Sequence, residues 1–356
     1  MPTDMPNDMT TNPPGDQPYD YDEFGLFHEN IAEFDLDVAQ MPPVERVEVL
    51  VEEGSDSQAD SNTARHISAL RWGTDDPEIV LIHGGAQNAH TWDTVALALG
   101  RPLVAIDLPG HGHSGWRQDG AYTPMNLADD VAVAIEALAP NARVVVGMSL
   151  GGLTSMELAV RHPHVVRSLV MVDVTPGVNS EKTKAITDFV DGPQAFASFD
   201  ELLERTKQFN PTRSESSLRR GILHNAAPAG DGSWEWRYDR GSRARAEQAA
   251  ASPSPSPVAA EAAPIDAPAD APEPTLTPET IAAVMNPLWD DFAAIACPMM
   301  LVRGSLSPVV DDDDVAEARR RQPTIDVQVV DGAGHSVQGD RPVEMAALLE
   351  TWLAAH

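Results

Sequence analysis

Between residues 44 and 176, short apolar runs alternate with segments whose apolar residues recur every three or four positions. The runs, most of them rich in branched side chains, predict strands, and the periodic segments predict helices. We expect strands within residues 46–51, 65–72, 78–85, 103–112, 143–149 and 168–177, and helices within 91–100, 125–139 and 153–163. Strand, helix and strand in succession predict an α/β fold with a mostly parallel sheet and helices on both faces.

The alternation stops at Gly177 and resumes at about residue 287. Between these points the pattern is mostly helical, with helices expected within residues 180–190, 198–209 and 214–226 and one possible strand around Trp236. Further strands are expected within residues 297–305 and 324–335, and further helices within 311–322 and 341–355. We therefore predict a core in two parts, residues 44–176 and 287–356, interrupted by a helical insertion at 177–286.

Two segments have compositions typical of disorder. Residues 241–278, within the insertion, consist almost wholly of Ala, Pro, Ser and acidic residues, which bury too little apolar surface to offset the entropy lost on ordering. Met1–Gln40 holds ten acidic residues and no Lys or Arg, so we expect residues 1–43 to form a disordered acidic tail. The aromatic residues around Tyr21 leave open that part of this tail docks on the core.

The charge balance narrows the choice of partners. The 356 residues include 24 basic and 55 acidic ones, and the resulting net charge of −31 repels phosphate backbones and anionic lipid surfaces. We therefore expect a small-molecule substrate and no nucleic acid. Cys297 is the only cysteine, which excludes an internal disulfide and, without a His/Cys cluster, a zinc site. The sequence shows neither a leader pattern nor an apolar window long enough to span a membrane, so we expect a soluble cytoplasmic protein.

The segment GMSLGG, residues 147–152, lies directly after a predicted buried strand and directly before a predicted helix. It matches the G-x-S-x-G pattern, in which a sharp turn exposes a serine hydroxyl and requires small neighbours. The same turn directs the amide of Leu150 and the positive end of the helix toward the space beside the Ser149 hydroxyl. Ser149 is therefore the predicted nucleophile.

A serine hydroxyl needs a base, usually a histidine that a carboxylate orients. His335, in VVDGAGHSVQ, follows the last predicted strand, at the same carboxyl edge of the sheet as Ser149. Most of the other ten histidines have simpler explanations; His83 in LIHGGAQ is expected to brace its loop. That loop exposes the backbone of Gly84 and Gly85, and an amide there could complete an oxyanion hole with the amide of Leu150.

The order of HGG, DLPGHGHS, GMSLGG, VMVD and GAGHSVQGDRP resembles the α/β-hydrolase fold superfamily, in its lidded esterase and lactonase-like branch, from about Val44 to Ala355. The resemblance implies an eight-stranded sheet, a helical lid inserted after the sixth strand, and a Ser, acid, His triad in that chain order. It also implies that Ser149 is the nucleophile, His335 the base, and Gly85 and Leu150 the oxyanion residues.

The acid is where this chain departs from the pattern. Most members carry Asp in the loop after the seventh strand, where this chain has Ser307. Some members use an acid at the end of the sixth strand, and Asp173 in VMVDVTP aligns with that position. We therefore assign the acid to Asp173. Asp311, whose carboxylate is also explained as a helix cap, remains the alternative.

A serine nucleophile argues against the dehalogenases and epoxide hydrolases of this fold, which attack with Asp. The predicted function is hydrolysis of a small carboxylic ester, lactone or thioester through an acyl-enzyme, without metal or organic cofactor. A carbon–carbon bond hydrolase and a haloperoxidase-like enzyme are lower-ranked alternatives, and a non-catalytic ligand receptor is the alternative from another class. The residues expected to bind the substrate in the lid are Phe189, Phe196, Phe199, His224 and Trp234.

Overall fold

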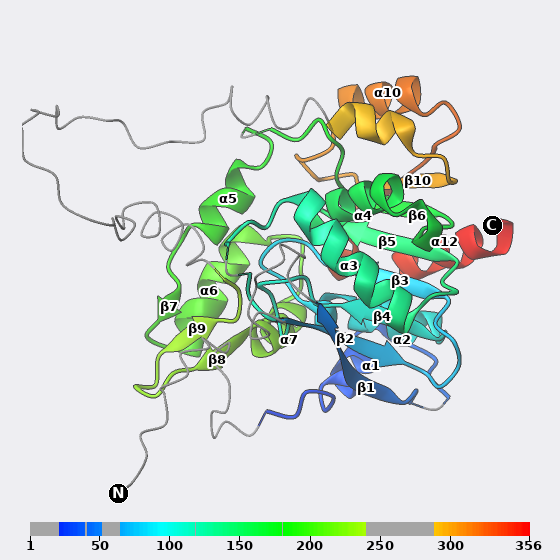
Figure 1. The fold of residues 1–356 in the computed structure, drawn as a ribbon. Helices are drawn as coiled ribbons and strands as arrows, with labels where there is room; N and C mark the ends of the chain where they lie inside the picture. The colour runs from blue at the N-terminus through cyan, green and yellow to red at the C-terminus, as the bar shows by residue number, and fades with distance from the viewer. Residues whose placement is uncertain (1–20, 40, 52–64, 118, 180, 240–287) are drawn as a thin grey trace, which may run out of the picture.

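A computed structural model describes residues 21–39, 41–51, 65–117, 119–179, 181–239 and 288–356. Eight strands form one sheet in the order β1-β2-β4-β3-β5-β6-β10-β11 (Figure 1). β2 pairs antiparallel with β1 and with β4, and every other neighbouring pair is parallel. The strands are β1 Val44–Val51, β2 Arg65–Trp72, β3 Ile79–Ile82, β4 Leu103–Ile106, β5 Val144–Met148, β6 Leu169–Val172, β10 Met299–Gly304 and β11 Asp326–Val330. The predicted mostly parallel, eight-stranded sheet is confirmed.

Helices cover both faces of the sheet, and an apolar cluster lies between the sheet and the helices on each face. On one face, α3 (Pro124–Leu138), α4 (Leu150–Arg161), α10 (Asp312–Arg321) and a helical segment at residues 288–294 contribute to one apolar cluster. On the other face, α2 (Asp93–Leu99) and α12 (Pro342–Ala355) pack together and form the second cluster. The β-branched and leucine side chains of the central strands are fully buried, which explains why these strands appear in the sequence as continuous apolar runs.

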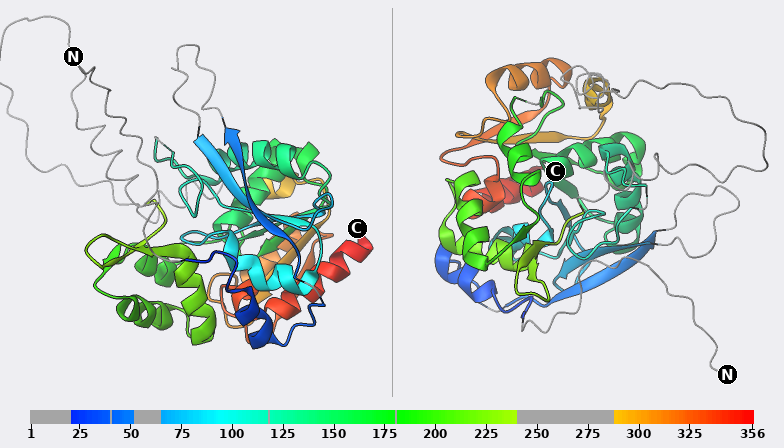
Figure 2. Two further views of the ribbon diagram at one scale, coloured as in Figure 1. Left: turned by 90° about the horizontal axis from the view of Figure 1, so that it is seen from below. Right: turned by 90° about the vertical axis from the view of Figure 1, so that its left-hand side faces the viewer.

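After β6, the described residues up to 239 form a separate layer, which we call the inserted segment (residues 177–239). It contains α5 (Lys184–Val190), α6 (Phe199–Phe209), α7 (Glu215–Asn225) and a small sheet of order β7-β9-β8. The short strands are β7 Ala195–Phe196, β8 Ala226–Pro228 and β9 Trp234–Trp236. Figures 1 and 2 show this layer beside one end of the large sheet. The strand expected around Trp236 is present, but β7 and β8 were not expected.

The first described residues correct the expectation of a disordered acidic tail. Residues 27–34 form α1 (Phe27–Phe34), and the ring of Phe27 is 2% exposed and lies 4.9 Å from the ring of Trp72. Several acidic side chains of this segment pair with arginines: Glu23 with Arg46 of β1, and Glu29 and Glu33 with Arg219 and Arg220 of α7. The charges that suggested a solvated tail therefore hold the segment against both the core and α7. Residues 1–20 and the Pro/Ala-rich insertion at 241–278 lie outside the described residues.

Candidate active site

Ser149 lies at the sharp turn between β5 and α4. Its backbone has φ 52° and ψ −119°, a strained conformation for a residue with a side chain. A Cβ on Gly147 would collide with the carbonyl oxygen of Gly151, and a Cβ on Gly151 would collide with the carbonyl oxygen of His83. Both flanking positions therefore require glycine, as the G-x-S-x-G pattern predicts.

The Ser149 side chain opens into a pocket of about 500 Å³, which lies within the size range of small-molecule sites. His335, from the loop after β11, lines the same pocket, so the structure brings together the predicted nucleophile and base. Residues from the inserted segment also line this pocket. The apolar ones include Ile186, Phe189, Val190 and Phe209.

His335 is oriented by Asp173, at the carboxyl end of β6. The Nδ1 atom of His335 lies 2.8 Å from Oδ2 of Asp173, whose side chain is fully buried. Because an ionised carboxylate can only accept, Nδ1 carries the proton and Nε2 is left as an acceptor for a serine hydroxyl. The backbone of Asp173 has φ 53°, a left-handed conformation that Asp adopts more readily than most residues.

Ser307, at the position where most members of the superfamily carry the acid, contacts the acid supplied from β6. Its hydroxyl donates a hydrogen bond to Oδ2 of Asp173, while the backbone N–H of Gly304 donates to Oδ1 at 3.0 Å. The alternative acid, Asp311, is engaged elsewhere. It caps α10 by accepting from the backbone N–H of Asp314 at 2.9 Å, and it pairs with Lys182 at 2.8 Å. The structure thus pairs His335 with Asp173 and not with Asp311.

The two predicted oxyanion residues flank Ser149. Leu150 is the first residue of α4, so its N–H has no acceptor within the helix. Gly84 and Gly85 line the pocket. A Cβ on Gly84 would lie 2.6 Å from Sδ of Met148 and 3.2 Å from Cβ of Ser149, whereas a Cβ on Gly85 would meet only Cδ2 of Leu150, at 3.9 Å. The tight packing of Gly84 brings this loop against the nucleophile turn.

His83 braces that loop, as predicted. It is fully buried; its Nε2 accepts from the N–H of Leu108 at 2.9 Å, and its Nδ1 lies 2.7 Å from the carbonyl oxygen of Gly84. Burial lowers the pKa of His83 to about 3, so the ring is neutral and can accept at one nitrogen and donate at the other. The sequence did not reveal the matching role of Asp107.

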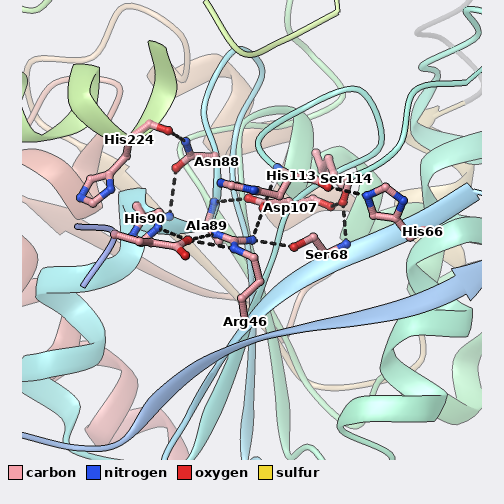
Figure 3. A network of polar contacts seen from close by, with 12 residues as sticks. Arg46, His66, Ser68, Asn88, Ala89, His90, Asp107, His113, Ser114 and His224 are labelled. Atoms are coloured by element: carbon pink, nitrogen blue, oxygen red, sulfur yellow. Dashed lines mark hydrogen bonds and ion pairs between the residues drawn. The ribbon is translucent and has the colours of Figure 1, made fainter. Parts of the chain in front are cut away.

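Asp107, in the DLPGHGHS segment, anchors the residues that follow the HGG loop (Figure 3). Its carboxylate accepts from the N–H of Ala89 at 2.7 Å, from the N–H of His113 at 3.1 Å and from Arg46 at 2.8 Å. Burial disfavours the charge, but the positive charge of Arg46 and the hydrogen bond from the N–H of Ala89 hold the pKa of Asp107 below its usual value. The buried carboxylate of Asp107 therefore links the residues after the HGG loop, the DLPGHGHS segment and β1.

Of the five lid residues expected to bind the substrate, only Phe189 lines the Ser149 pocket. Phe196 and Trp236 belong to the inserted segment's own core, where the Phe199 ring packs 5.0 Å from the Trp234 ring. His224 faces a second, smaller cavity. Phe196, Phe199, His224 and Trp234 do not line that pocket, and the Phe196, Phe199 and Trp234 rings pack within the inserted segment, where aromatic rings stabilise a small layer of short helices and strands.

Among the residues that the structure describes, one group could offer ligands to a metal ion: His90, Asp93 and His224, whose ligand atoms lie within 4.8 Å of one another. The rings of His90 and His224 are stacked 3.8 Å apart and nearly parallel (8°), so their in-plane lone pairs do not converge on one point. The ring nitrogens of His90 pair with Asp93 at 2.9 Å and Glu23 at 3.0 Å. Burial opposes a charge on His90, but these carboxylates raise its pKa to about 9, and His90 is held in ion pairs with both of them. Figure 3 shows His90 and His224 near each other.

Comparison with known proteins agrees with this geometry. Residues 77–342 match the family model described as alpha/beta hydrolase fold. The chain belongs to this family. Esterase Rv0045c of Mycobacterium tuberculosis is 39% identical to this hydrolase, over 90% of this chain and 92% of that protein. A solved structure of the M. tuberculosis esterase has a TM-score of 0.70 at 37% identity and covers 94% of this chain and 99% of that one.

A second relative of this α/β hydrolase has a different named activity. The 2-(acetamidomethylene)succinate hydrolase of Mesorhizobium japonicum is 25% identical, over 75% of this chain and 84% of that protein.

The match to the family model and the similarity to the solved esterase structure confirm the predicted superfamily and fold. In the part of the chain that the structure describes, no helix has the length and apolar character needed to cross a bilayer.

Proposed function

We propose that this α/β hydrolase cleaves a small-molecule carboxylic ester through an acyl-enzyme, with Ser149 as nucleophile, His335 as general base and Asp173 as the orienting acid. The observation that carries the proposal is the 2.8 Å contact between His335 and the buried Asp173, in the pocket into which the strained Ser149 opens. The similarity to an esterase over nine-tenths of the chain supports the predicted class of carboxylic ester hydrolase.

The reaction uses the proton positions that the contacts impose. Nε2 of His335 takes the Ser149 proton while Oγ bonds to the ester carbonyl carbon, and the carbonyl oxygen becomes an oxyanion that the amides of Gly85 and Leu150 stabilise. The intermediate collapses, the C–O bond to the alcohol breaks, and His335 returns its proton to the departing alkoxide. Water then attacks the acyl-enzyme with His335 again as base, releasing the acid and restoring the Ser149 hydroxyl.

The pocket walls favour a partly apolar substrate. Ile186, Phe189 and Val190 lie on α5, which has no fully buried residue of its own and faces the pocket. We propose that the inserted segment acts as a lid and that these side chains bind the apolar part of the ester. The i, i+3, i+4 spacing of the three residues is a signal that the sequence offered for this face.

Hydrolysis of p-nitrophenyl butyrate by the purified full-length chain tests the proposal. Ser149→Ala should abolish turnover and labelling by a fluorophosphonate probe, whereas Ser305→Ala should leave both unchanged. Ser305 is an exposed serine that bonds Asp331 and does not line the pocket, so it is a matched control. Turnover that survives Ser149→Ala, or a wild-type chain that neither turns over nor is labelled, would contradict the proposal.

The receptor alternative has two motives: a serine at position 307 in place of the usual acid, and the long segments whose composition is typical of disorder. The contact between Asp173 and His335 argues against the first motive, since Asp173, at the end of β6, supplies a carboxylate and Ser307 bonds to it.

A further inference from the structure

The loop and short helix after His335 carry an unusual number of unpaired polar atoms. Oγ of Ser336, Oε1 of Gln338 and Oδ1 of Asp340 are buried, and none has a hydrogen-bond partner among the described residues. Nε of Arg213, from the inserted segment, is buried and unpaired in the same sense. Buried polar groups are nearly always paired, so such a group of unpaired atoms beside an active site calls for an occupant.

The residues that carry these atoms line two neighbouring cavities. Ser336 and Asp340 line the pocket that Ser149 and His335 share. Arg213 and Gln338 line the second cavity, of about 120 Å³. Four residues line both spaces: Ala86, Gln87, Phe189 and Asn210.

Gly339 of α11 (Val337–Asp340) leaves room for the Arg213 side chain. A Cβ at Gly339 would lie 2.8 Å from Cζ of Arg213, 2.9 Å from its Nε and 3.0 Å from Oγ of Ser336. The guanidinium and the hydroxyl therefore approach the same point, and the absence of a side chain at residue 339 permits this.

Arg213 differs from its neighbour Arg220 in its partners. Arg220 forms an ion pair with Glu33, whereas the only side-chain hydrogen bond of Arg213 within the described part of the chain joins Nη2 to Oγ of Ser217, at 2.7 Å. Burial lowers the pKa of Arg213, and the negative charge of Asp340 opposes that effect. A guanidinium whose Nε–H is buried and unused is a strong and directional donor.

We propose that Arg213, Ser336 and Asp340 form a polar subsite that binds a neutral hydroxyl or amide group of the ester substrate, next to Ser149. The subsite offers unused donors on Arg213 and Ser336 and an unused acceptor on Asp340, so a group that both donates and accepts pairs with all three. A substrate carboxylate would face the Asp340 carboxylate, and a substrate ammonium would face Arg213. The inference rests on the proposed esterase function and adds the class of substrate.

Asp340 has a second contact that fixes the subsite relative to the catalytic base. Its Oδ2 accepts from the N–H of Gly334 at 2.7 Å, immediately before His335. A group bound to Oδ1 of the same carboxylate is thereby held at a defined place relative to the reacting carbonyl.

The test compares p-nitrophenyl esters of similar acyl length: butyrate, 3-hydroxybutyrate, succinamate, hydrogen succinate and β-alaninate. We expect kcat/KM to be at least about tenfold higher for the hydroxyl or the amide ester than for butyrate, the size of effect of a hydrogen bond to a charged group. The carboxylate and ammonium esters should react no better than butyrate. Equal rates for all five esters, as expected if water alone fills the subsite, or a preference for the carboxylate or the ammonium ester, would overturn the proposal.

Two variants assign the preference to the subsite. Arg213→Met should reduce the selectivity ratio of the preferred ester over butyrate to about one, since the donor is lost while most of the side-chain volume remains. Gly339→Ala should lower the same ratio by displacing the guanidinium, and it serves if Arg213→Met does not fold. Arg219→Met, a half-exposed arginine of α7 paired with Glu29, is the control and should keep the wild-type ratio. A ratio unchanged in both subsite variants refutes the assignment.

The outcome separates this inference from the proposed function. Hydrolysis of p-nitrophenyl butyrate that depends on Ser149, without any preference among the esters, would remove the subsite and leave the esterase. Hydrolysis that does not depend on Ser149 would remove both.

Discussion

Asp173→Asn is the most informative single change, because the contacts around the carboxylate determine what the amide must do. In the wild type, Oδ1 accepts from the backbone N–H of Gly304, and Oδ2 accepts from Ser307 and His335. The backbone N–H of Gly304 is fixed in position and can only donate. The single oxygen of the substituted side chain should therefore accept this hydrogen bond, as Oδ1 does in the wild type. The amide NH₂ then faces His335, which must present Nδ1 as an acceptor and move its proton to Nε2.

That tautomer cannot accept a proton from Ser149, because Nε2 already carries one. Loss of the correct tautomer costs about 10⁴ in kcat in serine triads, equivalent to about 5 kcal/mol of activation free energy. Asn is also among the residues that best tolerate the positive φ of position 173, so the backbone should be unaffected. We therefore expect a folded protein with kcat for p-nitrophenyl butyrate lowered by about three to four orders of magnitude.

Asp311→Asn is the matched control. Its carboxylate caps α10 and pairs with Lys182, so kcat should stay within about twofold of the wild type, a surface ion pair being worth little. Thermal melting of each variant establishes that it is folded. A kcat above a tenth of the wild-type value in Asp173→Asn, or a comparable loss of activity in both variants, would contradict the assignment of the acid to Asp173.

Two further predictions concern the loop and the N-terminal segment. Gly84→Ala should lower kcat for p-nitrophenyl butyrate by at least about tenfold, because the added methyl would strike Met148, whereas Gly85→Ala should cost less than about threefold; equal losses would contradict this. Glu23→Gln should lower the melting temperature at pH 7. Burial of the Glu23 carboxyl raises its pKa, but His90 and Arg46 outweigh this effect and lower the pKa to about 2 from 4.5. The difference in melting temperature between the wild type and Glu23→Gln should therefore shrink as the pH falls from about 4.5 toward 2. A difference in melting temperature that does not depend on pH would contradict this prediction.

Local pattern was enough to predict the sheet and the reactive turn. The strands from Ile79–Ile82 to Leu169–Val172 are buried on both faces, so each appears as an unbroken apolar run that ends at a polar or glycine position. The Ser149 turn is set by steric limits at Gly147 and Gly151, which act over a few residues and are therefore visible in the sequence.

Features that depend on distant contacts were harder to predict. The aromatic rings of the inserted segment had two possible uses, and only the packed structure shows that Phe199 and Trp234 pair with each other while Phe189 reaches the pocket. The role of Ser307 depends on its approach to Asp173, a residue 134 positions away.

The acidic composition of the N-terminal residues indicated disorder, but it does not show that several of these residues pair with arginines far along the chain. A signal was present nonetheless: Phe27, Ile31 and Phe34 recur at the spacing of one helix face, and residues 27–34 form α1.

The docking of α1 has a consequence for the lid movement proposed above. One face of this helix packs on Trp72 of the sheet, while its acidic side chains pair with Arg219 and Arg220 of α7. A hinge movement that carries α7 away from the sheet must therefore either peel α1 from Trp72 or break both ion pairs. In the proposed lid movement, opening is thus thermodynamically linked to a stretch of chain more than a hundred residues ahead of the nucleophile, and added salt, which screens ion pairs, should favour the open form.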